Sequence, residues 1–100
     1  MPYAEPLTDA EAAAAMAGLP DWSRDGTLIR RTVRASGFRA AVALVNAVAD
    51  AAEVANHHPD ICVTDYRNVS FTLTTHAAKA LTRRDIDLAT EIDRLIIGDA

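Results

Sequence analysis

Residues 53–85 read EVANHHPDICVTDYRNVSFTLTTHAAKALTRRD and contain all three histidines of the chain. A helical pattern runs into the start of this stretch. The helix must end near the two adjacent histidines, because Pro59 disfavours helical backbone geometry at His58. Apolar and hydroxyl-bearing residues then alternate over 69–74, which predicts a half-buried strand. The last four residues, Thr82 to Asp85, resemble a capping box at the start of a further helix. The sequence therefore places a helix end, a strand end and a helix start close to the histidines.

Working outward, the remaining patterns predict three helices and two hairpins. The predicted elements are a helix over 8–17, a hairpin in which residues 21–24 lead into a turn at Asp25-Gly26 and a strand over 27–34 returns, a helix over 37–56, a second hairpin with strands over 61–64 and 69–74, and a helix after the Thr82 cap. The order is α-β-β-α-β-β-α, with no crossover between parallel strands demanded by length. We therefore predict an α+β fold with a four-stranded antiparallel sheet and three helices packed on one face.

The helix predicted over 37–56 is the longest element, and it carries an apolar stripe at three- and four-residue steps. The stripe comprises Phe38, Ala41, Val42, Val45, Val48, Ala49 and Ala52. The last helix carries a similar stripe, which comprises Ile86, Ala89, Ile92, Leu95 and Ile96. We expect both stripes to lie against the sheet.

The length of 100 residues fits one domain over 1–100. Residues 1–7 contain two prolines and show no periodicity, so we expect them to form a loose arm. The formal charge is −4 and the basic residues are scattered, which disfavours nucleic acid or an anionic membrane as the main partner. The sequence shows no signal-peptide pattern and no apolar run of membrane-spanning length, which predicts a cytoplasmic protein.

The single cysteine, Cys62, cannot form a disulfide within the chain, so a reducing compartment is expected. We interpret it as a small buried hydrophobe within a strand rather than a reactive thiol. The single tryptophan, Trp22, has two open interpretations, as a core residue or as part of a ligand site.

The adjacent histidines His57 and His58 are the candidate proton-transfer groups of the stretch. Glu53 precedes His57 by four residues, so on a helix the two side chains would share a face and could touch. The end of the helix adds unpaired carbonyl groups, which favour a charged imidazole. Two adjacent imidazoles oppose being charged together, so the pair suits proton transfer near neutral pH. His76 ends the alternating strand and is predicted to join them.

A metal site is the main rival interpretation, because three histidines and Glu53 are ligands that zinc accepts. Adjacent residues point in different directions from a helix, however, and no His-Glu-x-x-His pattern is present. The prediction is therefore that no metal binds. Asp85 is interpreted as the carboxylate of the Thr82 capping box, and Glu53 as a partner that orients His57.

At this point the residues resemble a known family. The spacing of seven residues is similar to the signature of pterin-4a-carbinolamine dehydratases; they are Glu53, His57, His58, Pro59, Tyr66, His76 and Asp85. The resemblance implies the fold predicted above, homodimers or homotetramers, and a small-molecule pterin substrate. It also implies dehydration of 4a-hydroxytetrahydrobiopterin to quinonoid dihydropterin, the recycling step after aromatic amino-acid hydroxylation. No metal or organic cofactor is implied.

The resemblance also implies roles for individual residues. His57, His58 and His76 form the catalytic set, with His57 and His76 flanking the C4a hydroxyl and His58 helping to bind or serving the other stereoisomer. The implied substrate-binding residues are Asn56, His57, His58, Pro59, Thr74, Thr75, His76, Ala77 and Trp22. Glu53 and Asp85 are supporting residues.

A second function of another class stays open, that of a non-catalytic interaction or assembly-helper protein on the same fold. Some relatives act as a dimerisation cofactor for a homeodomain transcription factor, and others are linked to molybdenum-cofactor enzymes. The intact histidine set favours the enzyme, because a scaffold has no need of three imidazoles.

Overall fold

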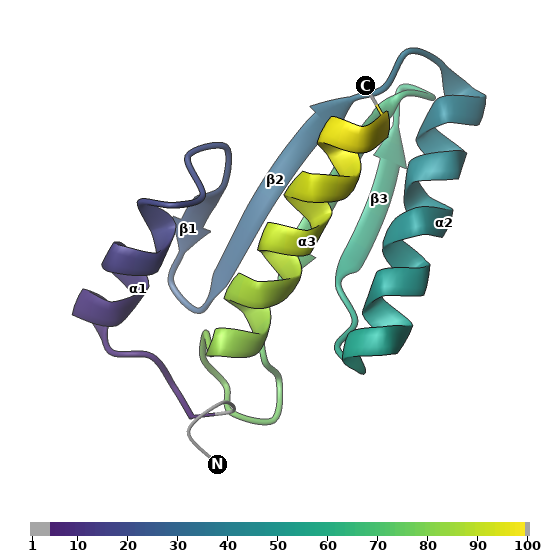
Figure 1. Ribbon diagram of the computed structural model, residues 1–100. Coiled ribbons are helices and arrows are strands. Elements are labelled where there is room, and N and C mark those ends of the chain that lie inside the picture. Colours follow the sequence, from purple (N-terminus) through teal and green to yellow (C-terminus); the bar gives the residue numbers. More distant parts are fainter. Residues whose placement is uncertain (1–4, 100) are drawn as a thin grey trace.

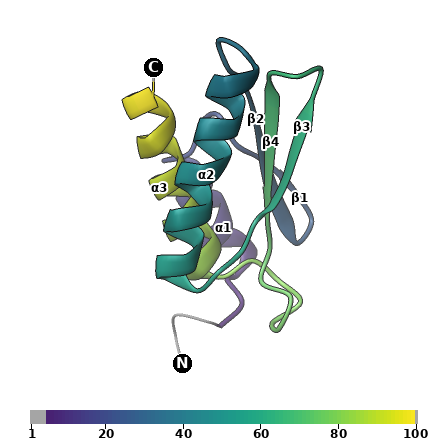
Figure 2. The ribbon, with the colours of Figure 1, turned by 90° about the vertical axis from the view of Figure 1, so that its right-hand side faces the viewer.

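The computed structural model describes residues 5–99, and its elements follow the predicted order (Figure 1). They are α1 (Asp9–Met16), β1 (Ser23–Asp25), β2 (Leu28–Arg34), α2 (Phe38–Ala55), β3 (Asp60–Thr64), β4 (Asn68–Leu73) and α3 (Arg83–Asp99). The four strands form one antiparallel sheet in the order β1-β2-β4-β3. Figure 2 shows the helices gathered on one side of this sheet. The predicted fold class is confirmed.

The first hairpin turns one residue later than predicted. Asp25 pairs with Leu28, so the two-residue loop consists of Gly26 and Thr27. Gly26 has a φ of 59°, in the left-handed region that glycine adopts without steric cost. The sequence therefore identified the glycine that makes the turn, but placed it at the second position of the loop rather than the first.

The buried face of α2 differs in phase from the predicted stripe. Its buried residues are Ala41, Leu44, Val48 and Ala52. Phe38, Val42 and Ala49, which were predicted to face the sheet, are exposed. Twelve of the 18 residues of this helix are alanine or valine, and the predicted stripe left out Leu44, which lies on the buried side. The stripe of α3 is closer to prediction, since Ile86, Ala89 and Ile92 are all buried.

The sheet has one face under the helices and one polar, uncovered face. On β4, the buried residues Val69, Phe71 and Leu73 point toward the helices, as predicted. On the edge strand β3, Ile61 is partly buried and packs against the core, whereas Cys62 is exposed. The interpretation of Cys62 as a buried hydrophobe is wrong, because the alternation of side chains along a strand places it on the uncovered face.

Trp22 belongs to the core, with 5% of its surface exposed. Its indole Nε1–H donates to Asp93 Oδ1 on α3, at 2.7 Å. The same oxygen accepts from Arg31 of β2, at 2.6 Å. One partly buried carboxylate therefore joins the last helix to the sheet and to the segment that precedes β1.

We predict that Asp93→Ala destabilises the protein by about 1.5–3 kcal/mol, because it leaves a guanidinium and an indole N–H without their shared acceptor. Urea unfolding followed by the fluorescence of Trp22, the only tryptophan, would measure the loss. Asp87→Ala is the matched control, since it removes the same charge from an exposed position of α3. Equal losses in the two variants would contradict the prediction.

The predicted N-terminal arm is described only from Glu5, because residues 1–4 lie outside the described part of the chain. At its end, the N–H of Leu7 donates to the carbonyl of Leu81 at 2.8 Å. The predicted capping box follows at once. Thr8 and Glu11 exchange hydrogen bonds of 2.9 and 3.1 Å, and the bond from the Thr8 backbone N–H lowers the pKa of the Glu11 carboxyl.

Among the described residues, no helix combines the length and the apolar character that crossing a membrane would need.

Candidate active site

The end of α2 determines where the first histidine points. Asn56 has the left-handed angles φ 50° and ψ 44°, and asparagine tolerates this region better than most residues. The N–H of His57 donates to the carbonyl of Ala52 at 3.1 Å, and the N–H of Asn56 donates to that of Glu53 at 3.2 Å. This pair of bonds is a Schellman motif, which ends the helix and turns the chain out of it.

His57 is buried and pairs with Asp85, not with Glu53. Its Nε2 lies 2.6 Å from Asp85 Oδ1, and no surface of Asp85 is exposed. The prediction that Glu53 orients His57 is wrong, because the left-handed residue between them breaks the helical spacing on which it depended. The two residues that meet are 28 positions apart in sequence, one just after the end of α2 and the other in the first turn of α3.

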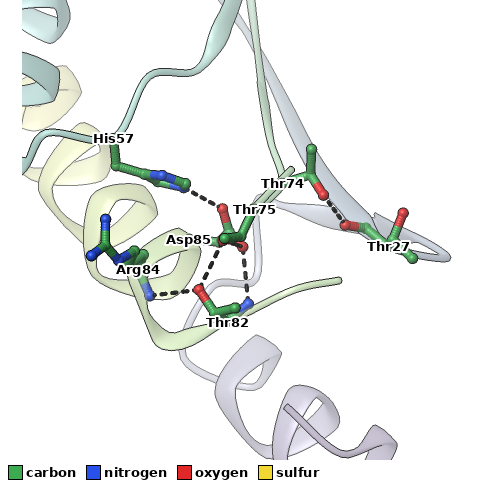
Figure 3. Close-up of polar contacts among 7 residues, drawn as sticks. All are labelled: Thr27, His57, Thr74, Thr75, Thr82, Arg84 and Asp85. Carbon is green, nitrogen blue, oxygen red and sulfur yellow. Dashed lines mark hydrogen bonds and ion pairs between the residues drawn. The ribbon is translucent and has the colours of Figure 1, made fainter. Parts of the chain in front are cut away.

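Asp85 also has the capping role that the sequence predicted. Its Oδ2 accepts from the backbone N–H of Thr82 at 3.0 Å, at the start of α3. The same oxygen accepts from the hydroxyl of Thr75 at 2.8 Å, and that hydroxyl lies 2.8 Å from the hydroxyl of Thr82 (Figure 3). The capping interpretation is therefore correct but incomplete. Oδ2 of Asp85 caps the start of α3, and Oδ1 contacts His57.

His58 lies on the surface, where Glu53 is its partner. Its Nε2 is 2.5 Å from Glu53 Oε2, with 59% of the histidine side chain and 75% of the glutamate side chain exposed. The two adjacent histidines therefore have different surroundings, one buried against a buried carboxylate and one in solvent.

His76 is exposed and begins the turn that follows the end of β4. The turn closes by an antiparallel bridge between Thr75 and Ala80. Thr75 reaches Asp85, which in turn reaches His57, so the backbone of His76 lies one residue from the network that holds His57. Figure 1 shows the end of α2, the start of α3 and this turn at the same end of the molecule.

Two threonines predicted to bind substrate have hydroxyl groups that are already engaged. Thr75 is buried and bonded to Asp85 and Thr82. The hydroxyl of Thr74 donates to the carbonyl of Thr27 at 2.6 Å, in the loop of the first hairpin (Figure 3). The contribution of these residues to the site is thus structural in the free protein.

The other predicted substrate-binding residues divide by location. Trp22 lies in the core and bonds Asp93, which follows Asp85 by eight residues, or about 12 Å along α3. The core interpretation of Trp22 is therefore confirmed. Asn56 and Ala77 are exposed and Pro59 is partly buried, at the same end as the histidines.

Thr82 was missed as a functional candidate. The only sequence signal for it was the capping box, and this explained its backbone contact without pointing to its hydroxyl. Its contact with Thr75 depends on the turn that brings residue 82 back beside the end of β4.

The metal alternative can be tested on the donor geometry of the described residues. Over residues 5–99, no group of three or more His, Cys, Asp or Glu side chains is arranged as a metal ion would require. The partners of His57 and His58 are separate carboxylates, one buried and one exposed. This geometry favours two independent imidazole–carboxylate pairs.

A groove of about 590 Å³ lies beside these residues, between α2 and α3. Its walls include Ala51, Val54 and Leu88, but none of the three histidines. We place the candidate site at the histidines, because the residues that line the groove include no imidazole to exchange protons near neutral pH.

The arrangement is suited to general acid–base catalysis. A buried carboxylate fixes the orientation of the His57 ring through a 2.6 Å hydrogen bond. An imidazole held in this way can give up or accept a proton with little reorganisation. The exposed His58 and His76 are accessible to a substrate from solvent.

The family comparison agrees with this geometry. A family model described as Pterin 4 alpha carbinolamine dehydratase matches residues 5–95. A relative from Nocardia farcinica, provisionally named a pterin-4-alpha-carbinolamine dehydratase, is 57% identical over 91% of this chain and 95% of its own. A relative from Chloroflexus aurantiacus with the same provisional name is 47% identical over 90% of this chain and 96% of its own.

Solved structures show the same fold. A transcriptional coactivator/pterin dehydratase from Brucella melitensis aligns with a TM-score of 0.86 and 28% identity, over 91% of this chain and 98% of its own. A pterin dehydratase-like protein identified as a RuBisCO assembly factor in the alpha-carboxysome aligns with a TM-score of 0.61, over 74% of this chain and 84% of its own. At 19% identity, this second likeness concerns the fold alone. Because the family model spans most of the chain and close relatives cover nearly all of it, the chain belongs to the pterin-4-alpha-carbinolamine dehydratase family.

Proposed function

We propose that the protein is a hydro-lyase that dehydrates 4a-hydroxytetrahydrobiopterin to quinonoid dihydropterin. The observation that carries the proposal is the buried pair of His57 and Asp85, held at the same end of the molecule as His58 and His76. Membership of the family supports the pterin as the substrate class. The reaction would serve pterin recycling after aromatic amino-acid hydroxylation.

The chemistry requires two proton transfers. Water leaves from C4a with its hydroxyl oxygen, so a donor must protonate that oxygen while N5 loses its proton to an acceptor. Each transfer by a positioned imidazole contributes about 10²–10⁴-fold to the rate. In the proposal, His57 and His76 flank the C4a hydroxyl, and His58 helps to bind the pterin or serves the other stereoisomer.

The compartment, the oligomeric state and the residues that line the substrate site are also part of the proposal. The resemblance to the family supports a cytoplasmic homodimer or homotetramer that uses no metal and no organic cofactor. Asn56, Pro59 and Ala77 are proposed to line the pterin site, because they lie at the same end as the three histidines.

Activity would be tested with chemically generated 4a-hydroxytetrahydropterin, by following formation of the quinonoid product in a stopped assay. We expect the protein to accelerate the dehydration, and His76→Ala to lower kcat by about 10²-fold or more. EDTA is expected to leave the rate unchanged, because no metal takes part. A rate with wild type equal to that of buffer alone would reject the enzyme, and loss of activity in EDTA would restore the metal alternative.

The alternative is a non-catalytic interaction or assembly-helper protein. The names of the two solved structures supply its basis, since one is called a coactivator as well as a dehydratase and the other an assembly factor. The dehydratase is preferred, because capping of α3 explains the contact of Asp85 with Thr82 but not the imidazole of His57 held on its other oxygen. An inactive wild type that retains this pair would favour the alternative.

A further inference from the structure

In the buried network around Asp85, each hydrogen bond has an identifiable donor and acceptor. This order of donors and acceptors bears on which nitrogen of the His57 ring carries the proton. We propose that Thr75 and Thr82 act through Asp85 as positioning residues, which hold the His57 ring with its proton on Nε2 and present Nδ1 to the substrate. The part that concerns the substrate rests on the proposed function. The part that concerns the tautomer rests on the geometry alone.

The hydrogen atoms of the network can be placed by counting donors. The backbone N–H of Thr82 can only donate, and it points to Asp85 Oδ2 at 3.0 Å. The hydroxyl of Thr75 donates its single proton to the same oxygen at 2.8 Å. Thr75 must therefore accept in its 2.8 Å contact with the Thr82 hydroxyl. The backbone N–H of Arg84, at 3.2 Å, donates to the Thr82 oxygen, which agrees with a Thr82 proton turned toward Thr75.

These donors favour an ionised Asp85 that accepts at both oxygens. Oδ2 receives two donors, and within the described part of the chain the hydrogen-bond partner of Oδ1 is the Nε2 of His57, at 2.6 Å. Asp85 is fully buried, so water does not compete for either oxygen. The ring must then donate through Nε2–H, because a carboxylate has no proton to offer. In the neutral ring, the lone pair lies on Nδ1.

Nδ1 is the ring atom that is free to react. Over residues 5–99, no hydrogen bond to it is found, and 11% of the His57 side chain is exposed. In the Ser-His-Asp triad the carboxylate holds Nδ1 and the ring reacts through Nε2. Here the carboxylate holds Nε2, so the proton exchanged with the substrate would move through Nδ1. Asp85 would stabilise the ring whenever it becomes charged.

The tautomer can be read directly by ¹⁵N NMR of protein labelled at histidine, at a pH where the ring is neutral. The His57 signals are those that disappear in His57→Gln. We expect a protonated Nε2 and an unprotonated Nδ1 in the wild type. A proton on Nδ1, or an equal mixture of tautomers, would overturn the proposal without any need for a variant.

Asp85→Asn is expected to reverse the tautomer. The donors Thr75 and Thr82 would hold the amide oxygen in the place of Oδ2, so the amide NH₂ would face Nε2 and drive the ring proton to Nδ1. With the reacting nitrogen protonated, kcat should fall by about 10²–10⁴-fold while KM changes little, as for the equivalent change in the triad. An unchanged tautomer together with wild-type kcat would reject the proposal.

Thr75 provides a milder pair of variants in case Asp85→Asn does not fold. Thr75→Val keeps the shape but removes the hydroxyl, and we expect a mixed tautomer and a kcat lowered about tenfold. Thr75→Ser should restore both. Thr72→Val, which removes a hydroxyl from the uncovered face of β4, is the control and should match wild type. Equal values for Thr75→Val and Thr75→Ser would contradict the proposal.

The two proposals fail in different ways. Absence of a dehydration rate in the wild type would reject the proposed function, and the NMR signals would still decide the tautomer. A wild type that is active but carries its proton on Nδ1 would retain the proposed function and reject this inference.

Discussion

His57→Ala is expected to lower kcat/KM for 4a-hydroxytetrahydropterin by about 10²–10⁴-fold, because it removes a positioned proton donor or acceptor from the reacting atoms. It also leaves the buried carboxylate of Asp85 without its ring partner. The measurement is the stopped assay, with the fold checked by the fluorescence of Trp22 and by circular dichroism.

His58→Ala is the matched comparison, since it removes the neighbouring imidazole from an exposed site. Its pair with Glu53 is a surface contact, so stability should change by less than about 1 kcal/mol. The effect on the rate should be smaller than that of His57→Ala and should differ between the two C4a stereoisomers. Full activity of folded His57→Ala would show that the buried histidine is not catalytic.

Phe71→Ala is expected to have the largest effect on stability, at about 3–5 kcal/mol. Phe71 lies on β4, which pairs with β2 on one side and with the edge strand β3 on the other, and its side chain is fully buried. Its removal would leave a cavity that the paired strands cannot close. Urea or thermal unfolding followed by circular dichroism would measure the loss.

Thr72→Ala is the control on the same strand, at the next residue and on the opposite face. It removes one hydrogen bond with Arg30, at 3.2 Å, and should cost no more than about 1 kcal/mol. Similar losses for the two variants would show that β4 does not have the two different faces described here.

The fold could be predicted from the sequence because its signals are local. The Thr8 capping box, the glycine of the first hairpin and the alternation over β4 each act within a few residues. The phase of α2 was mispredicted because the stripe left out Leu44, although the polar residues of the helix recur on the side opposite to it. Cys62 lies on the uncovered face because β3 pairs with β4 in a register that places Cys62 opposite Ser70. The short strand predicted over 61–64 did not determine this register.

The candidate site was predictable in its residues but not in their pairing. The spacing of the histidines and Asp85 selected candidate positions, whereas helical spacing assigned the wrong carboxylate to His57. The correct partner depends on the approach of α2 and α3, a tertiary contact that no local pattern encodes. Thr82 remained hidden for the same reason, because its hydroxyl meets Thr75 only after the intervening turn closes.

The left-handed residue at the end of α2 sets a rule for which amino acids can precede the histidine pair. Position 56 must adopt a positive φ, which glycine, asparagine and aspartate tolerate and β-branched residues do not. Aspartate and the asparagine of this chain differ in charge but share this backbone tolerance. An exchange between these two residues would therefore alter the charge beside the proposed pterin site while the direction of His57 toward Asp85 is preserved.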